Sequence, residues 1–315
     1  CQKQFSQYTC PRCNSRYCSL QCYKVTNSPV PCQEVKLEDL SPKELKQFRR
    51  VIASGELSKL IEPWTPWWRQ PSSRSISLSP EGCQLVKPVE LASGPEDKIT
   101  ENPVGPEGPL PPLRQLIRGD PSPFLAVHVV DVLYSYCFTL RLYNGDWHSD
   151  PLGAATVALG MSKVMGDLER PETVAEALAA CLEETCSPVY RHAGGFSFGI
   201  GLVDDVVCLL SLGTNALVCF LCDLQRLIQA GERILKSEKI GKTERRDTIR
   251  KLKSADKKVY FMMCWVHEQP EEVWSTIANF VEMEKTSLAR LGHGSKNFKV
   301  ERKGKQQSEV LIQEV

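Results

Sequence analysis

Apolar residues recur every three or four positions through most of the second half of the chain, which is the spacing of one face of an α-helix. The clearest stretch, residues 124–143, is apolar and aromatic, follows Pro121-Ser122-Pro123 and stops at Asn144-Gly145. The same pattern predicts helices over residues 152–168, 173–185, 203–212, 216–230 and 271–290. We therefore predict a mostly α fold, with a helical domain over residues 113–292 and a polar, disordered tail over residues 293–315.

One uncharged run in this region, residues 206–222, raises the question of a membrane span. It is bounded by Asp205 and Asp223 and is interrupted by polar and glycine residues. A spanning helix needs about 20 apolar residues, and this run is shorter. The pattern therefore favours a pair of buried core helices, and we expect no membrane partner.

A shorter helical segment is predicted over residues 38–70. Ser41-Pro42-Lys43-Glu44 has the order of a capping box, with proline at the first helical position. Leu45, Phe48 and Ile52 follow at helical spacing. A second short helix then runs as far as Pro63.

Half of the six tryptophans, Trp64, Trp67 and Trp68, lie near the end of this segment within five residues of one another. Large aromatic side chains fill protein cores and also anchor interfaces between proteins. We favour docking of the three rings onto the short helices of residues 42–61, which otherwise have little to pack against. Anchoring of a partner protein is the alternative.

Residues 71–112 separate this segment from the helical domain. They hold nine of the 21 prolines and no aromatic residue. A stretch of this composition does not build a core of its own, so we predict a flexible Pro-rich linker.

The charge of the chain is nearly balanced. With 42% hydrophobic and 24% charged residues and a net charge of +1, it has an ordinary globular composition and no overall attraction for nucleic acid. The excess of basic residues is local, in residues 1–32 and in residues 236–258. The second stretch mixes both signs along a predicted helix, which is typical of a solvated face. An acidic or RNA-bearing partner is the alternative.

Cysteine is the most unevenly distributed residue type. Six of the 14 cysteines lie in the first 32 residues, which contain few large apolar residues. A C-x2-C pair such as Cys10 and Cys13 presents two thiolates to one tetrahedral zinc ion, and six crowded cysteines exceed one four-ligand site. Nothing indicates an oxidising compartment, so we favour two zinc ions over disulfides.

These residues resemble a known family. The segments Tyr8-Thr9-Cys10-Pro11-Arg12-Cys13 and Tyr17-Cys18-Ser19-Leu20-Gln21-Cys22-Tyr23-Lys24 are similar to the HIT-type zinc finger, and the residues between the cysteines agree as well as the cysteines themselves. The resemblance implies a HIT-type finger over residues 1–32. Because the sequence opens on Cys1, we expect that finger to be N-terminally truncated.

The resemblance also implies the zinc ligands. In the family two ions are bound in an interleaved arrangement, so Cys18 and Cys22 would join an N-terminal pair of which Cys1 is retained. The other ion would be held by Cys10, Cys13, a histidine and Cys32. Thr26 stands at the position of that histidine, so the second site departs from the family pattern. Zinc held by protein at every position is structural rather than catalytic.

Motifs for catalysis are weak. Gly241-Lys242-Thr243 ends like a phosphate-binding loop, but Lys236 stands where its first glycine is required. The five histidines are scattered, and His128 is predicted to lie in the core of an apolar helix. Cys219 and Cys222 are predicted to be buried thiols. We therefore predict that the chain is not an enzyme.

The family resemblance implies an adaptor that binds RuvB-like AAA+ ATPases and assists assembly of ribonucleoproteins such as the U5 snRNP. Its expected partners are those ATPases and U5 snRNP proteins, in the nucleus and the cytoplasm. Direct binding of nucleic acid is not expected, because the finger lacks a recognition helix. The alternative function is a zinc-finger regulator that binds nucleic acid through the finger and the basic helix.

Overall fold

The structure, a computed structural model, describes six parts of the chain: residues 8–9, 16–17, 64–85, 102–166, 170–237 and 242–301. The chain divides into two compact units, Cys1–Pro63 and Trp64–Val315. Of the short helical segment predicted over residues 38–70, residues 38–63 lie outside the described residues.

In the first unit, two short strands form an antiparallel pair. Strand β1 (Tyr8–Thr9) pairs with β2 (Arg16–Tyr17), with Tyr8 opposite Tyr17 and Thr9 opposite Arg16. The antiparallel register requires the chain to reverse direction between Thr9 and Arg16.

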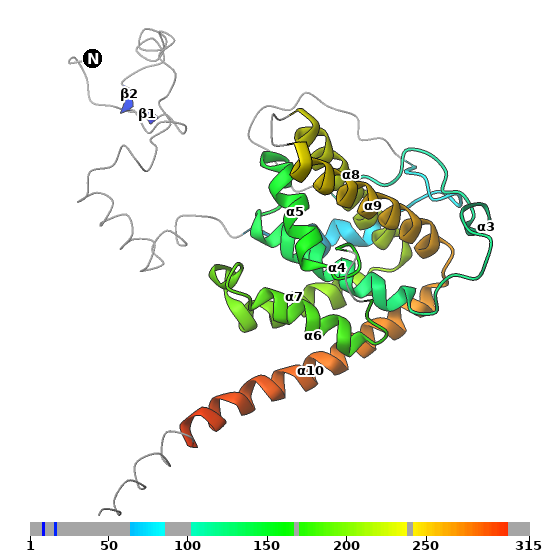
Figure 1. Cartoon of the computed structure of the whole chain (residues 1–315). Coiled ribbons are helices and arrows are strands. Elements are labelled where there is room, and N and C mark those ends of the chain that lie inside the picture. Colours follow the sequence, from blue (N-terminus) through cyan, green and yellow to red (C-terminus); the bar gives the residue numbers. More distant parts are fainter. Residues whose placement is uncertain are drawn as a thin grey trace, which may run out of the picture. The chain divides into compact units, whose positions relative to one another are not determined.

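The second unit is helical, which confirms the predicted mostly α fold (Figure 1). Two short 3-10 helices, η3 (Trp67–Arg69) and η4 (Pro71–Ser75), precede the α-helices, and two more, η5 (Trp147–Ser149) and η6 (Arg191–Ala193), lie between them. The α-helices of this unit are α3 (Leu113–Leu116), α4 (Leu125–Leu142), α5 (Pro151–Met161), α6 (Val174–Thr185), α7 (Gly195–Ser211), α8 (Thr214–Ser237), α9 (Lys242–His267) and α10 (Glu271–Glu301).

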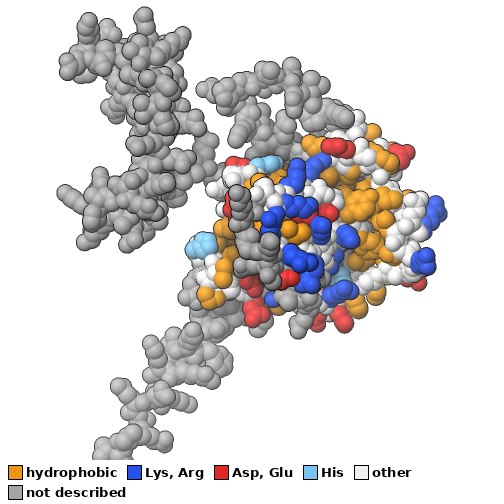
Figure 2. All heavy atoms as spheres, turned by 45° about the horizontal axis from the view of Figure 1, so that its top comes forward, with side chains coloured by type: hydrophobic (Ala, Val, Ile, Leu, Met, Phe, Trp, Pro, Cys, Tyr) orange, Lys and Arg blue, Asp and Glu red, His pale blue; other side chains and the backbone are white. Residues whose placement is uncertain are grey.

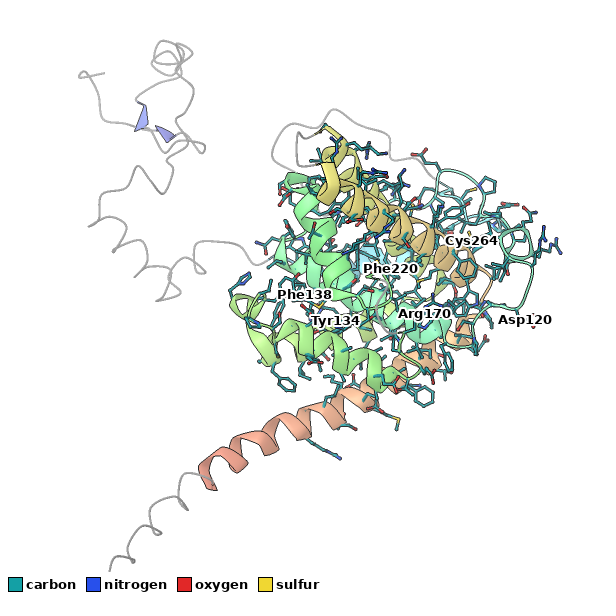
Figure 3. The ribbon with its side chains drawn as sticks, viewed as in Figure 1. Asp120, Tyr134, Phe138, Arg170, Phe220 and Cys264 are labelled. Atoms are coloured by element: carbon teal, nitrogen blue, oxygen red, sulfur yellow. The ribbon has the colours of Figure 1, made fainter. Side chains whose placement is uncertain are left out.

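Helix α4 lies at the centre of the core. It packs against α5, α6 and α7, and its side chains from Val129 to Leu140 are buried. Figure 3 shows the rings of Tyr134 and Phe138 on α4, and that of Phe220 on α8, inside the helical unit. Helix α4 has the length and composition of a membrane-spanning helix, but 78% of it is buried within the unit, as in the core helix of a globular domain.

The remaining helices cover this core in two groups. Helix α8 packs along α9 and also against α5, whereas α10 packs against α7 and α6. Trp274 at the start of α10 is completely buried and donates its indole N–H to the Thr214 hydroxyl at 3.0 Å. The first residues of α8 and α10 are thereby held together.

Side chains from outside each helix satisfy the free N–H groups at several helix starts. Asp150 accepts a hydrogen bond from the Gly153 N–H at the start of α5, and Thr173 does the same for Glu176 in α6. At α8 the acceptor comes from α10, because Glu271 accepts from the Thr214 N–H. Gly213, which precedes α8, has φ +82°, and a Cβ there would lie 2.4 Å from Glu271 Oε2.

The helix bounds differ from the sequence prediction in places. Helix α7 begins eight residues before residue 203, at Gly195, because its glycines allow close packing: a Cβ on Gly199 would lie 2.6 Å from Leu182 Cδ2. Helix α5 stops at Met161 rather than at residue 168. Helix α10 continues to Glu301, into the region predicted as a disordered tail.

The structure also differs from the flexible linker predicted over residues 71–112. Its described ends, residues 71–85 and 102–112, pack on the helical unit, where Leu78 and Leu110 are each only 8% exposed. The Gln84 N–H donates to the Pro106 carbonyl at 2.9 Å, which ties the two ends together. The segment needs no core of its own, because its isolated leucines pack into the core that the helices form.

Candidate functional site

All six cysteines proposed as zinc ligands, and Thr26, lie outside the described residues. The two described strands adjoin two of these cysteines in sequence. Strand β1 ends immediately before Cys10 and β2 ends immediately before Cys18. Cys10 and Cys13 lie between the strands in the sequence, and a C-x2-C pair offers two thiolates to one zinc ion. This donor chemistry fits a structural zinc site.

No comparable site occurs elsewhere in the described residues. Among them, no group of three or more His, Cys, Asp and Glu side chains is placed to hold a metal ion. Cys219 and Cys222 are buried, as predicted, and burial raises the pKa of Cys219 to about 12. A thiol with this pKa is almost entirely protonated at neutral pH, which suits a core residue rather than a zinc ligand.

His128 is also buried, as predicted for a core histidine. Its side chain lies on α4, and burial is the main cause that lowers its pKa below 6.5. Its Nε2 atom has no hydrogen-bond partner among the described residues. The neutral form of the ring is therefore favoured, and the residue acts as part of the packing of α4.

The tryptophan segment belongs to the helical unit. Trp67 and Trp68 are 4% and 1% exposed, and their rings meet edge to face with centroids 5.6 Å apart. Trp67 donates its indole N–H to the Tyr136 hydroxyl on α4 at 3.0 Å. The expectation that these two rings dock on residues 42–61 is therefore wrong, because the core of the helical unit covers both. Both rings are therefore mainly core residues, whereas Trp64 is half-buried.

A buried ion-pair network follows the tryptophans. Asp205 on α7 is completely buried and accepts a hydrogen bond from Arg69 Nε at 2.8 Å. Arg141 on α4 binds both carboxylate oxygens of Asp205, and this hydrogen bonding raises the pKa of Arg141. A buried carboxylate needs such partners. In the sequence Asp205 only marks the boundary of an apolar run, although a charge inside an apolar helix is itself a signal for a buried partner.

The basic stretch of residues 236–258 forms an exposed face on α9. Arg246, Arg250, Lys253 and Lys257 are spaced four, three and four residues apart, so they share one face of the helix, and all four are exposed. With Ile249 and Ser254 these residues line a shallow cavity of about 530 Å³. We call this surface the α9 basic face.

Acidic neighbours neutralise little of the α9 basic face. Asp247 lies 3.4 Å from Arg250, and Lys253 lies 3.9 Å from Glu232, with exposed cations in both pairs. Asp256 accepts hydrogen bonds from two glutamine side chains of α8 instead. Figure 2, which brings the top of Figure 1 forward, shows Lys and Arg side chains gathered on this side of the molecule. The surface is therefore positive over several residues.

Two protein families match parts of the chain. The HIT zinc finger matches residues 1–24, a range that contains Cys1, Cys10, Cys13, Cys18 and Cys22. The Shq1 domain of the SHQ1 protein matches residues 112–238, which extend from just before α3 to the end of α8. No solved structure matches the chain.

The first match confirms the finger that the cysteine spacing and the resemblance predicted. A HIT zinc finger binds zinc, so the cysteine-rich segment is a metal-binding module. The Trp64–Ser75 region and helices α9 and α10 lie outside both matched ranges. The chain thus carries a HIT-type zinc finger at its N-terminus, followed by a helical domain that is similar to the Shq1 domain.

Proposed function

We propose that the chain is a non-enzymatic adaptor that binds RuvB-like AAA+ ATPases and assists the assembly of ribonucleoproteins such as the U5 snRNP. The observation that carries the proposal is the presence, in one chain, of a HIT zinc finger and a domain similar to that of an assembly chaperone family for ribonucleoproteins. Residues 55–68 and 122–146 also resemble one HIT-finger protein, zinc finger HIT domain-containing protein 2. The proposed location is the nucleus and the cytoplasm.

The proposed finger holds two structural zinc ions. Cys1, Cys18 and Cys22 serve one ion, and Cys10, Cys13 and Cys32 serve the other, whose fourth position is changed by Thr26. Zinc supplies the folding energy of such a module, which is too small to bury a core of its own. The finger thereby becomes a rigid surface that presents side chains to a partner protein.

In this proposal the two units have different roles. The finger, in the unit Cys1–Pro63, binds the ATPase ring. The helical unit contacts a client such as a U5 snRNP protein or alters the nucleotide state of the ring. Support for this division comes from the separate ways in which the units are held together. Zinc organises one, whereas buried side chains such as Trp68 and Asp205 organise the other.

The test is retention of the full-length chain by purified RuvB-like proteins. The double variant Cys10→Ser/Cys13→Ser should lose most of the binding, because two thiolates of one zinc site are removed. The control Cys186→Ser changes an exposed cysteine of the helical unit and should bind like the original chain. Equal retention of the two variants would contradict the proposal that the finger binds the ATPase. If neither the original chain nor either variant were retained, the proposal that RuvB-like proteins are the partner would be wrong.

The α9 basic face favours a second candidate, the binding of nucleic acid. Cations that neutralise phosphates release counterions, so the affinity for single-stranded RNA would fall with salt with a slope of about 0.7 per phosphate contact. The variant Arg246→Gln/Lys257→Gln should reduce that slope, whereas Arg114→Gln/Arg118→Gln, outside this face, should not. Absence of RNA binding at low salt would exclude this candidate.

A further inference from the structure

A cavity of about 520 Å³ opens on the helical unit, apart from the finger and from the α9 basic face. Its walls come from the tryptophan segment, from residues 102–107, from the end of α4 with the turn after it, and from α8. Three tryptophans line it: Trp64, Trp67 and Trp147. Its size is typical of a cavity that takes one small ligand or one side chain of a partner.

The three indole rings are fixed by the walls. The N–H of Trp67 is used by the Tyr136 hydroxyl, and Trp147 is only 5% exposed. Trp64 lies against Gly145, where a Cβ would approach Trp64 Nε1 to 2.4 Å, so only glycine leaves room for the ring. Rings that are already fixed cost little conformational entropy when a ligand binds.

One face of Trp147 is already covered. The imidazole of His148 stacks on it, with ring centroids 3.6 Å apart and an angle of 19° between the planes. Trp67 and Trp147 are 4% and 5% exposed, so the little surface that they offer is directed to the cavity that they line. Much of the wall of the cavity is therefore aromatic.

Carboxylates complete the lining. Asp223 on α8 accepts a hydrogen bond from the Tyr136 hydroxyl at 2.8 Å, and Glu107 lies exposed at the margin. Burial is the main cause that raises the pKa of Asp223, even though its hydrogen bonds and the nearby Arg226 act in the other direction. A carboxylate that has lost part of its hydration gains from the arrival of a cation.

The cation already present in the wall does not fill this role. Arg226 donates from Nη1 to the Val104 carbonyl and from Nη2 to the Gly105 carbonyl, so its guanidinium is held against residues 104–105. The lining thus offers two carboxyl groups, Asp223 and Glu107, and a single cation, Arg226, which is already engaged. That balance disfavours an anionic ligand such as a nucleotide phosphate.

We propose that the Trp-lined cavity binds a cationic side chain of a partner protein whose charge is spread or alkylated, namely the guanidinium of arginine or a methylated ammonium. The faces of indole rings attract such cations, and tryptophan is the most effective of the aromatic residues in this role. The neighbouring carboxylates supply the counter-charge. The site is independent of the proposed ATPase binding, because its walls belong to the helical unit alone.

The test uses the full-length chain and small blocked amino acids as probes: N-acetyl-arginine amide, its dimethylated form, N-acetyl-trimethyllysine amide and neutral N-acetyl-citrulline amide. Binding is followed by tryptophan fluorescence and by the NMR shifts of the indole N–H groups. At least one cationic probe should bind saturably and at least roughly tenfold more tightly than citrulline. The order of the cationic probes then identifies arginine or methylated lysine as the source.

Two variants connect the binding to the cavity. Glu107→Gln changes an exposed side chain and should weaken the cationic probe several-fold without unfolding the chain, and Asp223→Asn should weaken it more. Glu81→Gln, an exposed residue that does not line the cavity, should have no effect. Equal binding of citrulline, unchanged binding by both cavity variants, or binding of adenosine monophosphate without any cationic probe would each overturn the proposal.

Discussion

Trp67 donates its indole N–H to the hydroxyl of Tyr136, 3.0 Å away and 69 residues later in the chain. Tyr136 in turn donates to Asp223 at 2.8 Å, so one series of hydrogen bonds joins η3, α4 and α8. The match to the Shq1 domain begins at residue 112, well after Trp67. The physical unit is therefore longer than the matched range and includes the tryptophan segment.

Because the tryptophan segment is part of the helical unit, we expect that truncating the Trp68 side chain strongly destabilises that unit. The side chain is 1% exposed and packs edge to face against Trp64 and Trp67. We expect Trp68→Ala to lower the free energy of unfolding of the helical unit by about 3–5 kcal/mol, as in other aromatic-to-alanine changes in cores. Chemical denaturation, monitored by circular dichroism, measures this change in the free energy of unfolding.

The control for this prediction is Leu85→Ala. Leu85 is 57% exposed, and we expect its replacement to change the free energy of unfolding by less than about 0.5 kcal/mol. If Trp68→Ala were as mild as the control, the tryptophan segment would not fold together with the helices.

The ion-pair network gives a second prediction. Asp205→Asn keeps the shape of the side chain but removes the charge that faces Arg69 and Arg141. The arginine side chains are 43% and 26% exposed, so water can partly replace the lost partner. We expect a loss of about 2 kcal/mol in the free energy of unfolding, below the value for a pair that is entirely buried.

Asp247→Asn is the matched control for Asp205→Asn. It removes a carboxylate that pairs with Arg250 on the exposed surface of α9, where both partners are more than half exposed. Such a pair contributes little, and we expect almost no change in the midpoint of thermal unfolding. Equal effects of the two substitutions would show that the Asp205 network adds no more than a surface pair.

The helices were predictable from the sequence because local spacing determines them. The apolar repeat located α4 and α6 to within one residue at either end, and Thr173 provides the N-cap of α6. The early start of α7 was not predictable in this way. Gly199 sits in that helix because Leu182 and Tyr134 leave no room for a side chain, which is a tertiary cause.

The candidate sites likewise include one that was predictable from the sequence and others that were not. Cysteine spacing and the residues between the cysteines predicted the finger, since metal ligands must be close in sequence when a module is small. The partners of Trp67 and Asp205 were not predictable, because Tyr136 and Arg141 reach them from segments more than 60 residues away. Local composition also suggested a linker around Leu78 and Leu110. These leucines pack into a core that is built mainly from helices far away in the sequence.

Thiol reactivity gives a third prediction. Burial raises the pKa of Cys219 to about 12 and that of Cys264 to about 11, whereas Cys186 is exposed. A higher thiol pKa means less reactive thiolate at a given pH, about one part in ten thousand for Cys219 at pH 8. Iodoacetamide at pH 8 should therefore modify Cys186 and spare Cys219 and Cys264.

Mass spectrometry of peptides measures this order of modification. The same reaction in concentrated guanidinium chloride should modify all three cysteines, because unfolding removes the burial that raises the pKa. The Cys219 side chain is completely buried. If it were modified as fast as Cys186 in the folded chain, α8 would have to open readily.

Removal of zinc gives a fourth prediction. The described residues of the helical unit hold no group of side chains placed for a metal ion, and their core is built from buried apolar residues. We expect a strong chelator to release zinc from the full-length chain while the unfolding midpoint of the helical signal stays the same. A clear fall of that midpoint would show that the helical unit depends on the metal.

The final prediction concerns Thr26, which in the proposed second zinc site stands at the position that the resemblance assigns to a histidine. A threonine hydroxyl is a poor ligand, whereas a neutral imidazole binds zinc at about 2.0–2.1 Å. We expect Thr26→His to complete the proposed site of Cys10, Cys13 and Cys32 and to raise its zinc affinity at least roughly tenfold, measured by competition with a chromogenic chelator. Thr26→Ala should leave the affinity unchanged. A loss of zinc in Thr26→Ala would instead show that the hydroxyl, directly or through water, occupies the fourth position, and Thr26→His would then bring no comparable gain.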